Sequence, residues 1–223
     1  MMMHQSIVSS NRAICLVGGA PVSDAVFAAV APFVEGFVGV DGGADHLLAR
    51  AVAPLAVIGD LDSLTAQARA TFSDCLWHIP EQETTDFEKA LSRVDAPQII
   101  ALGFTGGRLD HTLAVLNVMA RIPGRPVLLV DADDVSYLAP QGDSTIHLPA
   151  GTRVSLMPLG DVRASVSGVA WPFSDWALHP VGRTSASNMA TGGTVRITAQ
   201  GPLLVTLPQA HLHAVVTGDV RAG

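Results

Sequence analysis

Five short apolar runs, each followed by glycine or aspartate, alternate with alanine- and leucine-rich segments in the first part of the chain. The runs lie in AICLVGGA (13–20), GFVGVDGGA (36–44), LAVIGDLDS (55–63), QIIALGFTGG (98–107) and PVLLVDADD (126–134). Continuous apolar strands separated by helical segments are typical of a mostly parallel sheet covered on both faces. We therefore expect a three-layer α/β domain over residues 1–139. Its helices are predicted over 22–34, 42–51, 65–72, 85–94 and 108–121.

The pattern changes at about residue 140. Short stretches with strand character follow, separated by glycine and proline turns, at 144–149, 152–159, 164–171, 193–208 and 211–218. This text predicts a second domain over residues 140–223 that is all β and sandwich-like. His211 and His213 alternate along the last predicted strand, where we expect an exposed edge rather than a metal site.

Charge and composition limit the partners. The chain has 20 acidic and 13 basic residues, a formal net charge of −7 and no cluster of lysine and arginine. This balance argues against nucleic-acid binding, so an anionic partner would need a metal ion to mediate its binding. The only cysteines, Cys15 and Cys75, offer no disulfide framework, which fits a reducing cytoplasm.

No membrane-spanning or secretory segment is expected. The longest apolar region, 25–40, is interrupted by Pro32, Glu35 and Gly36 and falls short of the ~20 residues that span a bilayer. The N-terminus lacks the basic start of a secretory signal. We expect a cytoplasmic protein without a membrane contact.

Acidic residues follow the predicted strands at their carboxyl ends, where open α/β sheets bind ligands. Asp41 follows one strand, and Asp60 and Asp62 follow the next. Aspartates that converge on one rim repel each other unless a cation lies between them, and oxygen ligands without a Cys/His cluster favour Mg²⁺. The alternative is structural, because Asp-x-Asp-Ser also ends a strand and caps a helix, with Asp62 or Ser63 as N-cap.

The segment QETTDFEKAL contains a capping-box pattern, which predicts a helix with Thr85 as its N-cap. Asp86 and Lys89 then lie three residues apart on one face, near the positive end of the helix. A phosphate or a metal–phosphate complex could bind there. The alternative is an exposed helix start with a local Asp–Lys pair.

A third candidate segment is GGRLDH. Gly106 and Gly107 permit close approach of the backbone to a ligand, and Arg108 offers a two-pronged phosphate contact. Asp110 begins an amphipathic helix, and His111 is either an acid–base group or a structural partner of Asp110. The chain contains neither G-x-x-x-x-G-K-[ST] nor G-x-G-x-x-G, so any phosphate site must be assembled from separate loops.

Four segments, taken in order, resemble the motifs of the thiamine pyrophosphokinase (thiamine diphosphokinase) family in residue identity and spacing: DGGADHLL, IGDLDSL, QETTDFEKAL and GGRLDHTLAVLNVM. The resemblance extends from about Cys15 to Leu207. In its later part, GVAWPFSDWALHPVGRTSASNMATGGTVRITAQGPLL is similar to the thiamine-binding region of the family. That match is looser, because WPFSDW departs from the usual pattern and Ala186 stands where a hydroxyl residue is expected.

The resemblance implies a homodimeric, Mg²⁺-dependent enzyme that transfers the pyrophosphoryl group of ATP to the hydroxyl of thiamine and releases AMP. Each site would combine the N-terminal domain of one subunit with the C-terminal domain of the other. The metal–nucleotide cleft is then expected to include Asp41, Asp60, Asp62, Asp86 and Asp110, of which all but Asp41 are predicted metal ligands. Polyphosphate contacts are expected from Gln82, Lys89 and Arg108, and further nucleotide contacts from Ser63, Thr85, Gly106, Gly107 and His111. Thiamine is expected to stack on Trp171 and to bond with Ser187 and Asn188.

Several alternatives stay open at this stage. Trp171 could be a core residue, and Trp176 competes with it for the stacking role. A Mg²⁺-dependent phosphohydrolase would use Asp60 as a nucleophile. A non-catalytic nucleotide or thiamine sensor would keep the fold without the chemistry. The residues do not decide which carboxylate, if any, accepts the hydroxyl proton.

Overall fold

The computed structural model describes residues 5–122, 124–217 and 221–222. These residues form two compact units. Unit 1 contains the described residues up to 118 together with 125–132, and unit 2 contains 119–124 and those from 133 onward. Within the described residues, no helix is both long enough and apolar enough to cross a membrane.

Unit 1 is built on a parallel sheet whose strands lie in the order β8, β7, β2, β3, β4, β5. The strands are β2 (Ala13–Val17), β3 (Val34–Val40), β4 (Ala56–Gly59), β5 (Leu76–His78), β7 (Ile99–Leu102) and β8 (Val127–Val130). Every residue of β4, β7 and β8 is buried, as expected of strands covered on both faces. All five predicted strands are therefore confirmed. The three-residue edge strand β5 and the short parallel pair β1 (Val8–Ser9) and β6 (Val94–Asp95) were not predicted.

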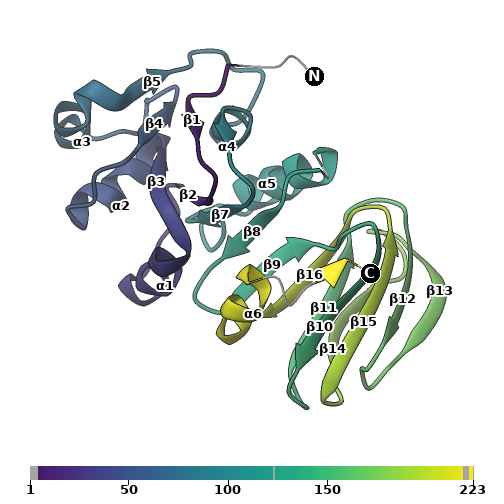
Figure 1. The fold of residues 1–223 in the computed structure, drawn as a ribbon. Coiled ribbons are helices and arrows are strands. Elements are labelled where there is room, and N and C mark those ends of the chain that lie inside the picture. The colour runs from purple at the N-terminus through teal and green to yellow at the C-terminus, as the bar shows by residue number, and fades with distance from the viewer. Residues whose placement is uncertain (1–4, 123, 218–220, 223) are drawn as a thin grey trace. The chain divides into compact units, whose positions relative to one another are not determined.

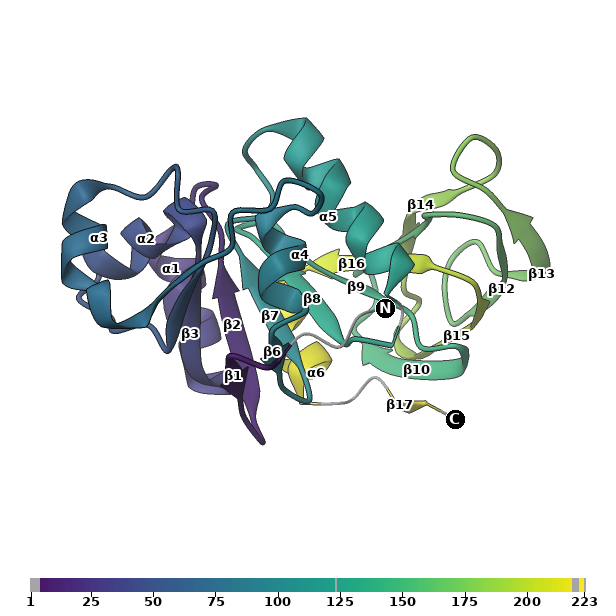
Figure 2. The ribbon, with the colours of Figure 1, turned by 90° about the horizontal axis from the view of Figure 1, so that it is seen from above.

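Helices cover both faces of this sheet. They are α1 (Asp24–Val30), α2 (Ala44–Ala49), α3 (Ala66–Thr71), α4 (Asp86–Leu91) and α5 (Leu109–Arg121), with 3-10 turns η1 (Ala31–Phe33), η2 (Asp41–Gly43) and η3 (Ser73–Cys75). Crossovers between parallel strands are right-handed, so the helices before β5 lie on one face and those after it on the other. Figures 1 and 2 show α1, α2 and α3 on one side of the sheet and α4 and α5 on the other. This arrangement confirms the predicted three-layer architecture.

Unit 2 is an antiparallel β-sandwich, as predicted. On one side of the sandwich the strands of this unit lie in the order β14, β11, β16, β9, and on the other side in the order β13, β12, β15, β10, β17. The strands are β9 (Asp134–Leu138), β10 (Gly142–Leu148), β11 (Arg153–Pro158), β12 (Val162–Ser167), β13 (Phe173–Leu178), β14 (Ser185–Met189), β15 (Gly193–Gln200), β16 (Leu203–Pro208) and β17 (Arg221–Ala222). Along β15, Val195, Ile197 and Ala199 are buried while their neighbours are more exposed, the period-2 pattern of a strand with one face in the core.

The predicted strand over 211–218 is wrong in its described part. Residues 209–216 form the 3-10 turn η4 (Gln209–His211) and the helix α6 (Leu212–Val216), and residue 218 lies outside the described residues. Leu212 and Val215 are three residues apart and both buried, which is the spacing of one helix face. His211 and His213 therefore do not share a strand face.

Candidate active site

A pocket of about 750 Å³ lies where the carboxyl ends of the strands of unit 1 meet. From β2 the chain proceeds through β3 and β4 to β5 on one side, and later returns to place β7 on the other side of β2. Such a reversal of strand order opens a crevice, which is where ligands bind in open α/β sheets. The lining residues are Gly18, Gly19, Ala20, Pro21, Val40, Asp41, Gly42, Asp60, Ser63, Gln82, Thr84, Thr85, Asp86, Phe87, Lys89, Gly103, Phe104, Gly107, Arg108, His111, Ala114 and Val115.

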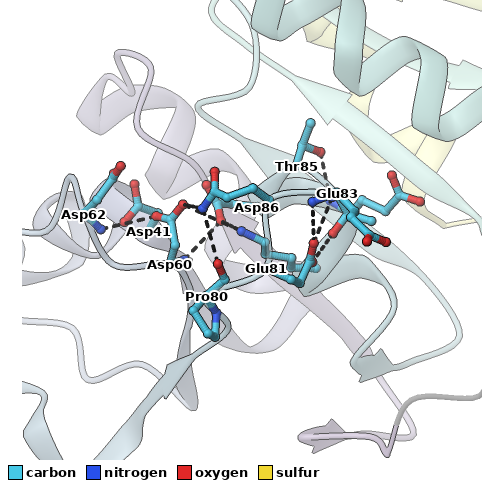
Figure 3. Close-up of polar contacts among 12 residues, drawn as sticks. Asp41, Asp60, Asp62, Pro80, Glu81, Glu83, Thr85 and Asp86 are labelled. Atoms are coloured by element: carbon cyan, nitrogen blue, oxygen red, sulfur yellow. Dashed lines mark hydrogen bonds and ion pairs between the residues drawn. The ribbon is translucent and has the colours of Figure 1, made fainter.

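Three carboxylates converge at one end of this pocket. Asp41, Asp60 and Asp86 each offer an oxygen within 4.8 Å of the others. Asp41 and Asp60 follow β3 and β4, whereas Asp86 is the first residue of α4 (Figure 3). Oxygen ligands alone, at this spacing, suit a hard divalent cation such as Mg²⁺. The residues present therefore fit the metal that the sequence implies.

Lys89 supplies the positive charge within this acidic group. Its side chain is only 2% exposed, and its Nζ lies 3.0 Å from Asp86 Oδ1 and 3.7 Å from Asp60 Oδ2. The predicted helix start is confirmed, because Thr85 Oγ1 accepts the backbone N–H of Glu88 at 3.3 Å. The cap fixes the first turn of α4, so Asp86 and Lys89 point into the pocket from one helix face. Thr85 itself lines the pocket.

Hydrogen bonds orient Asp60. Its Oδ2 accepts the Gln82 side-chain N–H at 2.9 Å, and its own backbone N–H donates to Asp86 Oδ1 at 3.2 Å (Figure 3). The Gln82 hydrogen bond is the largest of the effects that lower the pKa of Asp60 below its ordinary value, and Lys89 adds to it. Asp60 is thus held ionised and ready to bind a cation.

Asp62 lies outside the group of three carboxylates. The residue between the two aspartates, Leu61, is buried and has a left-handed backbone conformation with φ of 64°. This turn follows Asp60 directly and leaves Asp62 exposed, where its Oδ1 accepts Ser63 Oγ–H at 2.9 Å. Ser63 does line the pocket, and its backbone N–H faces Asp41 Oδ1 at 3.4 Å.

Burial has the opposite effect on Asp41. Its desolvation raises its pKa above the ordinary 3.8, and the nearby charge of Asp86 raises it further. Folding therefore stabilises the neutral acid relative to the carboxylate, so this group supports folding fully below pH 3.8 and ceases to do so as the pH rises through its raised pKa. At neutral pH the buried carboxylate therefore opposes folding.

Replacement of Asp41 by asparagine is accordingly expected to raise the midpoint of thermal unfolding at pH 7 without Mg²⁺. Asn also tolerates the left-handed conformation found at Asp41, where φ is 47°. The gain should shrink as the pH falls towards 4, because the wild-type carboxyl becomes protonated there. Thermal unfolding of both proteins at pH 7 and pH 4 checks this, and a less stable variant at pH 7 would contradict it.

Arg108 and Asp110 form an exposed ion pair at the start of α5. The Arg108 guanidinium contacts Asp110 through Nε at 3.1 Å and Nη2 at 2.5 Å, and this hydrogen bonding lowers the pKa of Asp110. Arg108 and His111 line the pocket, and so does Gly107, but Gly106 and Asp110 do not. The structure therefore brings Arg108 towards the ligand space while Asp110 engages its guanidinium.

Two glycine loops also line the pocket, and the residues of the first loop were not among the predicted site residues. Gly18 and Gly19 follow β2, and Gly103 follows β7. A Cβ on Gly18 would lie 2.6 Å from the carbonyl oxygen of Gly103, so the two loops touch through backbone atoms. The sequence feature that could have predicted this loop is the Gly-Gly pair directly after the first apolar run. The same feature predicted a ligand contact at Gly106 and Gly107.

The three predicted thiamine contacts all lie in unit 2. Trp171 is 62% exposed, and buried Asn188 holds its backbone on both sides. Asn188 Oδ1 accepts the Trp171 N–H at 3.2 Å, and Asn188 Nδ2 donates to the Trp171 carbonyl at 2.9 Å. Ser187 is exposed and left-handed, with φ of 61°. Asn188 thus acts on the backbone that carries the tryptophan, and Ser187 remains open to solvent.

The ring of Trp176 already contacts other side chains of unit 2. It stacks on Phe173 with centroids 4.4 Å apart, and the Arg183 guanidinium lies 4.3 Å from its centroid. Trp176 is therefore part of a packed row, whereas the ring of Trp171 is largely open.

A parallel sheet that gathers carboxylates, a buried lysine and an arginine at its switch point is typical of α/β enzymes that transfer phosphoryl groups. Two family models agree with that class. The model for the thiamin pyrophosphokinase catalytic domain matches residues 34–127, and the model for the vitamin B1 binding domain of the same family matches residues 143–204. The chain belongs to the thiamine pyrophosphokinase family.

Individual relatives agree with this assignment. A thiamine pyrophosphokinase 1 of Oryza sativa is 29% identical over 173 residues, which is 69% of this chain and 66%, just under two thirds, of that protein. Thiamin pyrophosphokinase 1 of Caenorhabditis elegans is 26% identical over 76% of this chain and 77% of its own length.

Solved structures share the fold. Thiamin pyrophosphokinase from Candida albicans has a TM-score of 0.76 at 16% identity, covering 92% of this chain and 93% of that one. The enzyme from Geobacillus thermodenitrificans has a TM-score of 0.73 at 26% identity, covering 88% and 96%.

Proposed function

We propose that this protein is a thiamine diphosphokinase, which transfers the pyrophosphoryl group of ATP to the hydroxyl of thiamine and yields thiamine diphosphate and AMP. The observation that carries the proposal is the group of Asp41, Asp60 and Asp86 around buried Lys89, in a pocket that also receives Arg108. Membership of the family supplies the two substrates. A cytoplasmic location belongs to the same proposal and agrees with the free thiols of Cys15 and Cys75.

Asp60 and Asp86 would hold the metal, and Asp41 would be the third carboxylate beside them. Asp62 is two residues from Asp60 and exposed, so we propose it as a further ligand from the solvent side. Asp110 was also predicted as a ligand, but its pairing with Arg108 supports a role in holding that guanidinium. Bound Mg²⁺ would neutralise charge on the phosphate oxygens of ATP.

The chain's own cations complete the electrostatics. The thiamine hydroxyl oxygen bonds to the β-phosphorus, the bond from that phosphorus to the α–β bridging oxygen breaks, and AMP leaves with the electron pair. This reaction depends on charge stabilisation and in-line placement more than on covalent help. Lys89 is fixed by two carboxylates, so it offers a preorganised charge, and Arg108 offers a second one. The hydroxyl proton is lost in the same reaction, and the carboxylates of the pocket are its candidate acceptors.

Trp171 is the proposed stacking surface for thiamine. Its open indole suits the cationic thiazolium, because a cation over an aromatic face gains about 0.5–2 kcal/mol. Replacing Trp171 by alanine is therefore expected to raise the KM for thiamine about tenfold and to leave thermal stability nearly unchanged.

Trp176→Ala is the matched comparison for this variant. It should lower thermal stability, because it removes the ring between Phe173 and Arg183. Steady-state kinetics and thermal unfolding of both variants test the assignment. A rise in the thiamine KM only in Trp176→Ala would transfer the role to that ring.

We further propose a homodimer whose sites each combine residues of two subunits. Asp60→Asn chains would be inactive alone, and Trp171→Ala chains would be weak alone when thiamine is well below their raised KM, which is the condition for this assay. After co-refolding, mixed dimers should recover activity, because one of their two sites is then fully wild type. No recovery from a confirmed mixed dimer would refute the composite site.

The direct test incubates the pure protein with Mg-ATP, with and without thiamine, and separates AMP from ADP. AMP formed only with thiamine supports the proposal, and ADP would indicate a different kinase. The phosphohydrolase alternative predicts phosphate release from simple esters without thiamine. Absence of all three activities would favour the sensor.

A further inference from the structure

The loop at residues 18–21 lines the pocket with little side-chain bulk of its own. Gly18 and Gly19 offer no side chain to pack, and glycine-rich segments lose much conformational freedom on folding. Hydrogen bonds to its backbone therefore matter more to its position than side chains of its own. Groups on two sides of the loop supply these hydrogen bonds.

One side of the loop is held by β7. The Gly18 N–H donates to the Leu102 carbonyl at 2.8 Å, and the Ala20 N–H donates to the Gly103 carbonyl at 2.9 Å. A Cβ on Gly107 would lie 3.0 Å from the Ala20 Cβ, so the two glycine loops are in close contact. These contacts engage the N–H groups of Gly18 and Ala20 but leave the carbonyls of the loop to other partners.

The other side is held by α2. His46 Nε2 lies 2.9 Å from the Ala20 carbonyl oxygen, which makes its N–H the donor. Four residues further along, Arg50 donates to the Val22 carbonyl at 2.7 Å and to the His46 carbonyl at 3.0 Å. Helix α2 therefore holds two carbonyls of the loop that joins β2 to α1.

The position of α2 is itself tied to the acidic end of the pocket. The helix begins directly after η2, which contains Asp41. A Cβ on Gly43 would lie 1.8 Å from the Val17 carbonyl oxygen, so the start of α2 rests against the end of β2. Asp41 of the metal group and His46 at the glycine loop therefore lie on one short continuous segment, η2 followed by α2.

We propose that His46 is a positioning residue for nucleotide binding: by donating to the Ala20 carbonyl, it holds the backbone of residues 18–21 where the Mg-nucleotide contacts it. The proposal rests on the proposed function, since it assumes that this pocket binds the nucleotide. His46 does not line the pocket and acts only through the loop.

The test compares His46→Leu, which removes the donor, with His46→Gln, whose side-chain N–H reaches a similar distance. ATP binding is measured by calorimetry with Mg²⁺ and without thiamine, and kinetics are measured with both substrates. His46→Leu is expected to raise the Kd and the KM for ATP about tenfold, with kcat and the KM for thiamine within about threefold of wild type. His46→Gln should recover most of the loss.

Asp24→Asn is the matched control. Asp24 pairs with Arg50 on the outer side of the same network, but its side chain is 92% exposed. Surface pairs of this kind contribute little, so ATP binding should be unchanged. Thermal unfolding of all three variants should fall within a few degrees of wild type.

The outcomes separate the two proposals. Unchanged ATP affinity in His46→Leu, or an equal loss in His46→Gln, overturns the role of His46. A wild-type protein that binds Mg-ATP but makes no AMP with thiamine overturns the proposed function alone, and the binding data still decide on His46. A wild-type protein that does not bind Mg-ATP overturns both.

Discussion

Replacing Asp60 by asparagine is expected to lower the rate of AMP formation by about 10³-fold, the largest effect of any single change considered. Asp60 has a lowered pKa and is held by Gln82 and by the backbone N–H of Asp62. An amide in its place loses the negative charge and offers one oxygen instead of two. Folding should change little, because Asp60 lies at the mouth of β4 rather than in the core.

Two measurements check this result. AMP formation gives the loss of rate, and the rise in unfolding temperature on adding Mg²⁺, expected for wild type, should largely disappear in the variant. Asp74→Asn is the matched control, since it neutralises an exposed aspartate that does not line the pocket. Turnover of Asp60→Asn within tenfold of wild type would refute the metal role of Asp60.

Lys89→Met is expected to lower kcat by about 10²-fold or more and also to reduce stability. Methionine preserves the length of the buried side chain but leaves Asp60 and Asp86 facing each other without a cation. Removing one partner of a buried pair costs about 3–5 kcal/mol, and the partial exposure of both aspartates should reduce this to about 2 kcal/mol. Mg²⁺ should restore more stability to this variant than to wild type, because it replaces the missing charge.

The double variant Lys89→Met/Asp86→Asn separates charge from packing. It removes one positive and one negative group, so its stability without Mg²⁺ should return towards wild type while activity stays low. Denaturant unfolding with and without Mg²⁺ measures both effects. If the double variant is as unstable as Lys89→Met, packing rather than charge explains the loss.

Local sequence rules predicted the start of α4 and the shared face of Asp86 and Lys89. The Thr85 cap and the three-residue spacing of Asp86 and Lys89 define a geometry that does not depend on the rest of the fold. The apolar runs likewise predicted five strands of the parallel sheet, because strands that are largely buried on both faces read as continuous apolar runs in the sequence.

The convergence of Asp41 with Asp60 and Asp86 could be predicted only roughly. The carboxyl ends of parallel strands share an edge, but the left-handed turn at Leu61 decides which aspartate of the Asp-x-Asp pair faces inward. A leucine gives no sequence signal for that conformation, which is unusual for its type. The helix at 212–216 was missed for a related reason, since a five-residue apolar segment fits either period.

The reversal of strand order has a consequence for how the pocket can be divided. Its carboxylates and Lys89 come from residues 41–89, whereas Gly103, Phe104 and Arg108 come from the segment that follows β7. A fragment that stopped before β7 would keep every acidic group yet lack the opposite wall. The proposed recognition of the phosphate chain would therefore depend on the completed sheet, and no contiguous half of unit 1 could be transplanted to carry it.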